Sequence, residues 1–177
     1  MSVAANRYAK ALMDILYPKS AEAGLQQLQD FVSLLNEQKA ARGFLQNPSM
    51  AGDRRARLLQ EISAALSFDR RVANFVNILT DRNRLPLLEE IITQYQKLLD
   101  ERRGIVRARV TAARSLDALQ QRELAGKLEQ ITGKQVLMEV AVDPSLIGGV
   151  IAQVGSTIYD GSVRHQLQAF KSRLVEE

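Results

Sequence analysis

The stretch that decides the fold is GIVRARVTA, residues 104–112, because the spacing of apolar residues changes there. Within it apolar residues alternate with arginine and threonine, which is the two-residue repeat of a strand buried on one face. Before it, apolar residues recur at helical spacing. The sequence therefore predicts two domains, 1–103 and 104–177, that differ in secondary structure.

Six amphipathic helices are predicted in the first domain. Each apolar stripe is bounded by proline, glycine or a helix-capping residue. Ser67 is the expected N-cap of the fifth helix, and Pro86 occupies the first turn of the sixth. Helices joined by such short loops form a compact bundle.

The second domain is predicted to contain a strand, a helix, a β-hairpin and a helix. Ser115 is the expected N-cap of the first helix, and Gly133 the left-handed residue that ends it. The alternating run 136–142 and the run 147–154 are expected to pair as the hairpin. The apolar stripe of the last helix, capped by Ser162, comprises Val163, Leu167, Phe170 and Leu174. The fold class is mainly α, with a small α/β domain after a six-helix bundle.

The composition offers little material for catalysis. With no cysteine and one histidine, the sequence lacks thiolates and almost all imidazoles, which are the usual zinc ligands, nucleophiles and general bases. That histidine, His165, lies on the polar side of its predicted helix, so we expect it at the surface. We predict no catalytic, cofactor-binding or metal-binding residues.

No apolar run approaches the roughly 20 residues that a membrane span requires. The N-terminus also lacks the apolar core of a signal peptide, so we expect a cytoplasmic protein of bacterial type. A net charge of +4 permits a nucleic acid or an anionic surface as a partner without deciding between them.

Two glycines, Gly148 and Gly149, raise the question of phosphate binding. A phosphate-binding loop needs glycines directly before a helix, whereas this pair lies in an apolar, strand-like run. An enzyme that uses them on a phosphate substrate is the weakest alternative. We expect them to admit a close neighbour instead. On that basis Gly149→Asp would bury an unpaired carboxylate and cost several kcal/mol.

A second glycine-containing segment, Asp160-Gly161-Ser162, opens the last predicted helix, and Arg164 follows in its first turn. A helix N-terminus with an arginine can bind an anion. A turn followed by an N-cap accounts for the same residues without a ligand, and we favour it.

Arginine clusters keep a helical RNA-binding module open as an alternative function. Acidic residues interrupt these clusters, and the four tyrosines and five phenylalanines fall mostly in apolar stripes rather than on a base-stacking surface. The clusters are Arg54-Arg55-Arg57, Arg70-Arg71, Arg82-Arg84 and Arg102-Arg103.

The first helix carries a segment suited to close contact with another helix. In RYAKAL, residues 7–12, the small side chains of Ala9 and Ala11 flank Tyr8 and Leu12. Tyrosine adds a large contact area with a polar tip. Packing inside the bundle accounts for part of this stripe.

The whole chain resembles the delta subunit of bacterial and chloroplast F-type ATP synthases, a family related to the mitochondrial oligomycin sensitivity conferral protein. Tyr159 and Met50 depart from the residues usual in the family, but both keep an apolar character. The motifs that carry the resemblance are RYAKAL, FLQNPSM, DRNRLPLLEEIITQY and DPSLIGGVIAQVGSTIYDGSVRHQL.

The resemblance implies a non-catalytic stator subunit. It implies that the six-helix domain caps the catalytic head and takes the N-terminal helix of an alpha subunit into a groove between its first and fifth helices. The second domain would hold the b subunits of the peripheral stalk, so that the head resists rotor torque. The complex would place the chain peripherally at the cytoplasmic face of the bacterial plasma membrane.

Carried onto this sequence, the resemblance assigns residues to two surfaces. Apolar anchors on two neighbouring helices suit a groove that grips an amphipathic helix. The expected groove residues are Tyr8, Leu12, Ile15, Phe75, Ile78 and Leu79. The residues expected at the structural, b-subunit side are Gly148, Gly149, Asp160, Gly161, Ser162 and Arg164.

Overall fold

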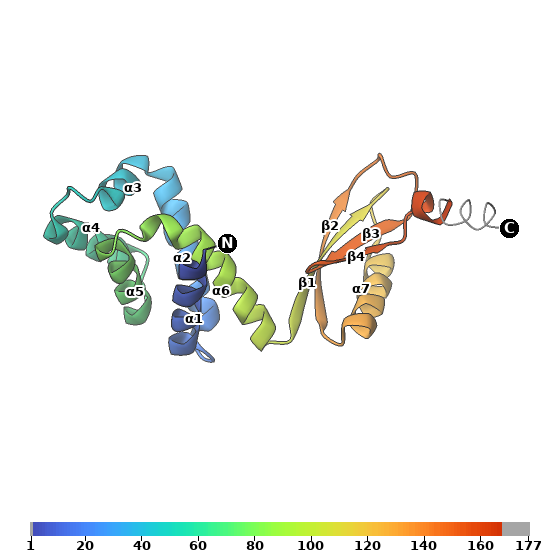
Figure 1. Ribbon diagram of the computed structural model, residues 1–177, viewed down its shortest axis with the longest axis horizontal. Helices are drawn as coiled ribbons and strands as arrows, with labels where there is room; N and C mark the ends of the chain where they lie inside the picture. The colour runs from blue at the N-terminus through green and yellow to red at the C-terminus, as the bar shows by residue number, and fades with distance from the viewer. Residues whose placement is uncertain (1, 168–177) are drawn as a thin grey trace. The chain divides into compact units, whose positions relative to one another are not determined.

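The computed structural model describes residues 2–167, whose helices and strands are drawn in Figure 1. The chain divides into two compact units between Leu99 and Asp100, shortly before the boundary expected at Gly104. Each unit has its own hydrophobic core, so each is described by itself.

The first unit is helical, as predicted. A short 3₁₀ helix, η1 (Leu85–Leu87), contains Pro86 and leads directly into the last of its six α-helices. The α-helices are α1 (Val3–Leu16), α2 (Ala21–Glu37), α3 (Lys39–Gln46), α4 (Gly52–Ala65), α5 (Arg70–Asp81) and α6 (Leu88–Arg102).

The core of the first unit takes one face from each helix. Phe31 of α2 and Tyr95 of α6 are fully buried in it, and the Tyr95 hydroxyl donates a hydrogen bond to the Ala21 carbonyl at 3.0 Å. This bond satisfies a polar group that burial would otherwise leave unpaired. Residues of α1 and α5 also belong to this core, so only their remaining residues form the exposed surface of these helices.

The start of α5 differs from the prediction. Asp69, not Ser67, is the N-cap, and its carboxylate accepts a hydrogen bond from the Arg71 N–H at 2.8 Å. Ser67 lies in the left-handed region with φ of 51°, where the chain turns out of α4. A residue needed for that reversal cannot adopt the extended conformation that an N-cap requires.

The second unit is a four-stranded sheet in the order β2-β1-β3-β4, with residues 163–167 helical beyond it. Its elements are β1 (Ile105–Ala112), α7 (Ala118–Thr132), β2 (Gln135–Val142), β3 (Val150–Val154) and β4 (Thr157–Asp160). β1 pairs in parallel with β2 and antiparallel with β3. The mainly α fold with a small α/β unit is thus confirmed, although Phe170 and Leu174 lie outside the described residues.

The predicted pairing of runs 136–142 and 147–154 is wrong. β3 begins at Val150, pairs with β1, and forms its hairpin with β4. The segment through α7 returns the chain parallel to β1, and β3 then occupies the other edge of that central strand. Alternation identifies the buried face of a strand but carries no information about which strand lies beside it.

α7 covers one face of the sheet. Leu128 packs against Val110 and Val136 in the core of this unit. Asp117, two residues after the expected Ser115, is the N-cap and forms a reciprocal capping box with Gln120. Gly133 ends the helix in the left-handed conformation, as predicted.

Candidate functional site

α1 and α5 lie side by side and run in opposite directions. The rings of Tyr8 and Phe75 meet edge to face, with centroids 6.2 Å apart. At the other end of α1, the Arg71 guanidinium donates to the Ile15 carbonyl at 3.3 Å and to the Ser20 hydroxyl at 3.0 Å. The end of α1 therefore contacts the start of α5, and the two antiparallel helices together form one side of the bundle surface.

The six residues expected to line a groove here separate into two groups. Ile15 and Ile78 keep 57% and 46% of their surface exposed, and Tyr8 is half-buried. The other three belong to the core: Leu12, Phe75 and Leu79 are 1%, 8% and 0% exposed. The helical turn points these three at the bundle interior, so in the chain by itself they lie beneath the surface, and their contact with a partner helix stays a prediction.

Beside Tyr8 the surface is hollowed to a volume of about 370 Å³. Small side chains on α1 are among its lining residues, as expected for Ala11, whereas Ala9 is fully buried in the core. The lining residues are Ala4, Arg7, Tyr8, Ala11, Arg82 and Arg84. The arginines were not assigned to this site from sequence, although Arg7 opens the RYAKAL motif and the other two flank Asn83 in DRNR.

A rigid turn at the end of α5 positions Arg82 and Arg84. Asn83 adopts a left-handed conformation with φ of 53°, and its N–H donates to the Thr80 carbonyl at 3.0 Å. The Arg84 N–H donates to the Leu79 carbonyl at 2.7 Å, which completes a Schellman motif. The backbone beneath both arginine side chains is thus fixed by hydrogen bonds.

Arg55 of α4 supports this turn from inside. Its side chain is only 8% exposed and donates to the Asn83 side-chain oxygen at 2.9 Å and to the Thr80 carbonyl at 3.3 Å. It binds the carbonyl end of α5, where the helix dipole is negative. Arg55 is therefore not a surface cation of the kind that the RNA-binding alternative requires.

Arg71 is also occupied within the chain. It forms an ion pair with Asp69 at 3.0 Å, and hydrogen bonding between the two side chains lowers the pKa of Asp69 and raises the pKa of Arg71. Two of the arginines in the predicted clusters thus serve helix termini rather than an external phosphate.

In the second unit, the Gly149 backbone lies close against the turn after β4. A Cβ atom there would be 2.3 Å from the Gly161 oxygen and 2.9 Å from the Ser162 Cα, and φ is +83°. The expected close neighbour is confirmed, and it is backbone. Gly149 itself is exposed, so the expectation that Gly149→Asp buries a carboxylate is wrong; the steric clash is what carries the cost.

The candidate anion site at the start of the last helix is closed by the chain itself. The Ser162 N–H donates to Asp160 at 2.8 Å, and the His165 N–H donates to the Ser162 hydroxyl at 3.2 Å, which confirms Ser162 as the N-cap. The Val163 N–H donates to the Gly148 carbonyl. Hydrogen bonding from Ser162 also lowers the pKa of Asp160. These N–H groups are therefore already satisfied.

Beside Gly148 and Gly149 the second unit has a hollow of about 540 Å³. Ile147, one of its lining residues, is 72% exposed. Arg164 and His165, at the start of the last helix, are exposed as well. The lining residues are Ala112, Ala113, Arg114, Leu116, Gln120, Pro144, Leu146, Ile147, Gly148, Gly149 and Val150.

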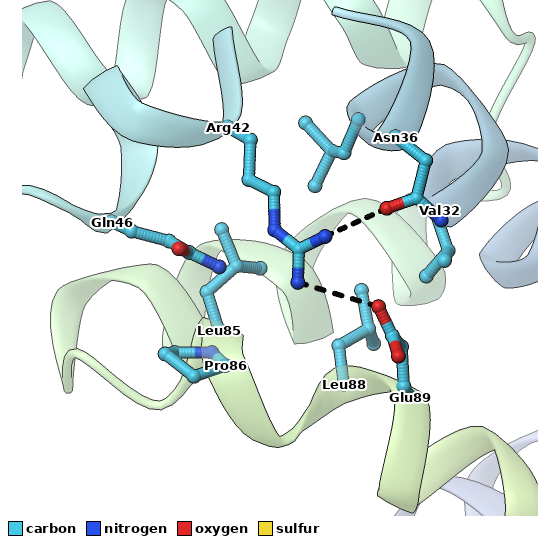
Figure 2. A pocket seen from close by; sticks show the side chains of 9 residues that line it. Val32, Asn36, Arg42, Gln46, Leu85, Pro86, Leu88 and Glu89 are labelled. Atoms are coloured by element: carbon cyan, nitrogen blue, oxygen red, sulfur yellow. Dashed lines mark hydrogen bonds and ion pairs between the residues drawn. The ribbon is translucent and has the colours of Figure 1, made fainter. Parts of the chain in front are cut away.

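A third pocket, shown in Figure 2, lies between α2, α3 and the start of α6. Arg42 points across it, donating to the Asn36 side-chain oxygen at 2.7 Å and pairing with Glu89 at 3.3 Å. Its volume of about 10 Å³ has room for little more than one water molecule. These polar side chains therefore link three elements and leave no space for a ligand.

Within residues 2–167 no three histidine, aspartate or glutamate side chains come together as metal ligands. None of the helices described in that range combines the length and apolar character needed to cross a bilayer.

Comparison with known proteins gives a match over nearly the entire sequence. Residues 4–174 match the family described as ATP synthase delta (OSCP) subunit. The chain is 39% identical to ATP synthase subunit delta of Anaeromyxobacter dehalogenans strain 2CP-1 over 175 residues, which is 98% of both proteins. It is 36% identical to ATP synthase subunit delta of Chlorobium phaeobacteroides, covering 99% of this chain and 97% of that protein.

The fold is also found in a solved complex. A chain of the Toxoplasma gondii mitochondrial ATP synthase hexamer superimposes with a TM-score of 0.65 at 22% identity. The match covers 99% of this chain and 98% of that chain. At this identity the likeness concerns the fold alone.

Proposed function

Since the chain belongs to the ATP synthase delta (OSCP) subunit family, we propose that it links the catalytic head of the enzyme to its membrane-anchored peripheral stalk. Members of this family are structural subunits of ATP synthase and carry no catalytic site of their own. The chain accordingly serves ATP synthesis and ion transport as part of the stator.

The groove between α1 and α5 is the proposed contact with the head. The observation that carries this proposal is the pair of exposed apolar side chains, Ile15 and Ile78, on two neighbouring helices that are joined by the contact of Tyr8 with Phe75. Such a surface suits the apolar stripe of an amphipathic helix. The occupant is the N-terminal helix of an alpha subunit, packed over the buried Leu12, Phe75 and Leu79.

The second unit is the proposed contact with the b subunits. Its hollow beside Gly148 and Gly149 adjoins the exposed Ile147, which offers apolar surface to a partner. The turn through Gly161 and Ser162 packs against Gly149, and the Val163 N–H donates to the Gly148 carbonyl, so the same segment is held in place. Asp160 and Arg164, on either side of the Ser162 N-cap, are exposed and are the proposed polar contacts of this unit.

A stator works by resisting displacement. Rotation of the central shaft exerts torque on the catalytic head, and a link from the head to the stalk prevents the head from turning with the shaft. Proton flow is then converted into ATP synthesis. We place the chain peripherally, at the cytoplasmic face of the bacterial plasma membrane, through its partners.

Titration of the full chain with a peptide of the organism's own alpha-subunit N-terminus tests the groove. We expect micromolar binding that Ile78→Asp weakens at least about tenfold, since a carboxylate would replace a central apolar contact. Ile131→Asp is the matched control, because Ile131 is also exposed but lies on α7. Absence of binding, or equal binding by both variants, would refute the groove assignment. Retention of RNA at low salt would favour the RNA-binding alternative.

A further inference from the structure

Three arginines gather at one end of the α1/α5 groove. Arg7 comes from the first half of α1, and Arg82 and Arg84 come from the turn that ends α5. All three line the hollow next to Tyr8. Since α1 and α5 are antiparallel, this end lies opposite the one where Ile15 meets Arg71.

These three side chains have no partner within residues 2–167. Other arginines of the chain are engaged, such as Arg71 with Asp69 and Arg42 with Glu89. By contrast, the guanidinium groups of Arg7, Arg82 and Arg84 make no ion pair or hydrogen bond with any described residue. Asp81, the acidic residue adjacent in sequence, is exposed and does not line the hollow.

The fold holds the cluster together despite its like charges. The Schellman motif centred on Asn83 fixes the backbone of Arg82 and Arg84, and Arg55 anchors that motif from the interior. A depression lined by charges of one sign and backed by a low-dielectric core concentrates positive potential. The surface of α1 and α5 therefore combines the exposed apolar side chains of Ile15 and Ile78 with a cationic hollow at one end.

We propose that Arg7, Arg82 and Arg84 bind carboxylate side chains at one end of the docked helix and so fix its direction in the groove. This inference rests on the proposed function, since it concerns the same groove and the same occupant. Guanidinium groups bind carboxylates through paired, charge-assisted hydrogen bonds. The helix that fits is amphipathic, with acidic residues near only one end of its apolar stripe.

A directional charge contact complements the apolar one. Contacts with Ile15 and Ile78 supply burial but tolerate a helix lying in either direction, because apolar surfaces are not directional. Pairing at one end favours a single direction and register, and it accelerates association. Reversed docking would leave the three arginines facing the apolar stripe without a counter-charge.

The test compares two double variants that change the net charge equally. Arg82→Glu with Arg84→Glu alters the cluster, whereas Arg54→Glu with Arg57→Glu alters exposed residues of α4 outside the hollow. Binding of the alpha-subunit N-terminal peptide is measured at low and high salt. We expect the first pair to weaken binding at least about fivefold at low salt, with a smaller effect at high salt. The control pair changes affinity less than about twofold.

A reciprocal exchange strengthens the test. In this exchange the acidic residues at one end of the peptide are replaced by lysine. The altered peptide should bind the Arg82→Glu, Arg84→Glu variant more tightly than it binds the wild-type chain. If the double variant does not fold, the single variant Arg7→Glu, at an exposed position of α1, replaces it in the binding measurement. If wild type binds the peptide but the cluster variants match the control, the inference is overturned and the proposed function stands. If wild type does not bind at all, the proposed function fails.

Discussion

Replacement of Gly149 by alanine should destabilise the second unit far more than its exposed position suggests. The added Cβ would meet the Gly161 oxygen at 2.3 Å and the Ser162 Cα at 2.9 Å. Real Cβ atoms do not come this close to backbone, so the turn after β4 has to move. That movement strains two hydrogen bonds across the contact, Gly161 N–H to Val150 and Val163 N–H to Gly148.

The magnitude follows from two contributions. A side chain at φ of +83° costs about 1–2 kcal/mol. Forcing an extra methyl group into a packed contact costs about 1–3 kcal/mol more. The sum is about 2–5 kcal/mol, toward the upper end if one of the two backbone hydrogen bonds is lost. A domain of ordinary stability has only about 5–15 kcal/mol to lose.

Native-state hydrogen exchange on the full chain measures this effect in the second unit, because the amides of β1 and β3 report its opening free energy. The matched control is Gly155→Ala in the turn between β3 and β4. Gly155 also has positive φ, at +61°, but a Cβ there meets nothing within 4 Å. The control therefore contains the conformational cost without the contact.

The difference between the two variants isolates the close approach. We expect Gly149→Ala to exceed Gly155→Ala by about 1–3 kcal/mol in lost opening free energy. Equal losses would show that the backbone contact adds nothing to the lost opening free energy, which would then come entirely from the positive φ. In that case the account of Gly149 as the point where two segments meet would be wrong.

Two further predictions concern the core and the response to acid. Leu79→Ala should lower the free energy of unfolding by about 2–5 kcal/mol in chemical denaturation, because Leu79 is fully buried. Ile78→Ala, one residue earlier and 46% exposed, should cost less than half as much, and equal losses would contradict the assignment of Leu79 to the core. Because hydrogen bonding from Ser162 lowers the pKa of Asp160 below 3.8, the carboxylate stabilises the fold above that pH and loses its effect as pH falls through the lowered value. The stability difference between wild type and Asp160→Asn should then shrink in acid below pH 3.8, and a difference that persists there would contradict this role.

Local patterns predicted the helices and the first two strands, but β4 was not predicted and β3 begins at Val150 rather than at residue 147. The change of apolar spacing at Gly104 marks where β1 begins, and Gly133 ends α7 in the expected left-handed conformation. Caps were less accurate: Asp69 and Asp117 replace Ser67 and Ser115, each two residues later. Aspartate and serine are both good N-caps, so a choice between neighbours depends on how the preceding chain arrives.

The two candidate surfaces were only partly predictable. Helical spacing groups Leu12, Ile15, Ile78 and Leu79 as apolar, but it does not say which of them the bundle core will cover. Arg7 and Arg82 are far apart in the chain, and only the packing of α1 against α5 brings them to one hollow.

The sequence by itself determined the two-unit division, the helices, strands β1 and β2, and the absence of cysteine chemistry, because composition and the repeats of 3.6 and 2 residues are local properties. Tertiary structure alone decided that β3 lies beside β1, that Gly149 faces the Gly161 backbone, and that three arginines share one end of a groove. Each of these depends on which distant segments pack together. Burial of apolar surface drives that packing, and because it is not directional, no single stretch of chain specifies its partner.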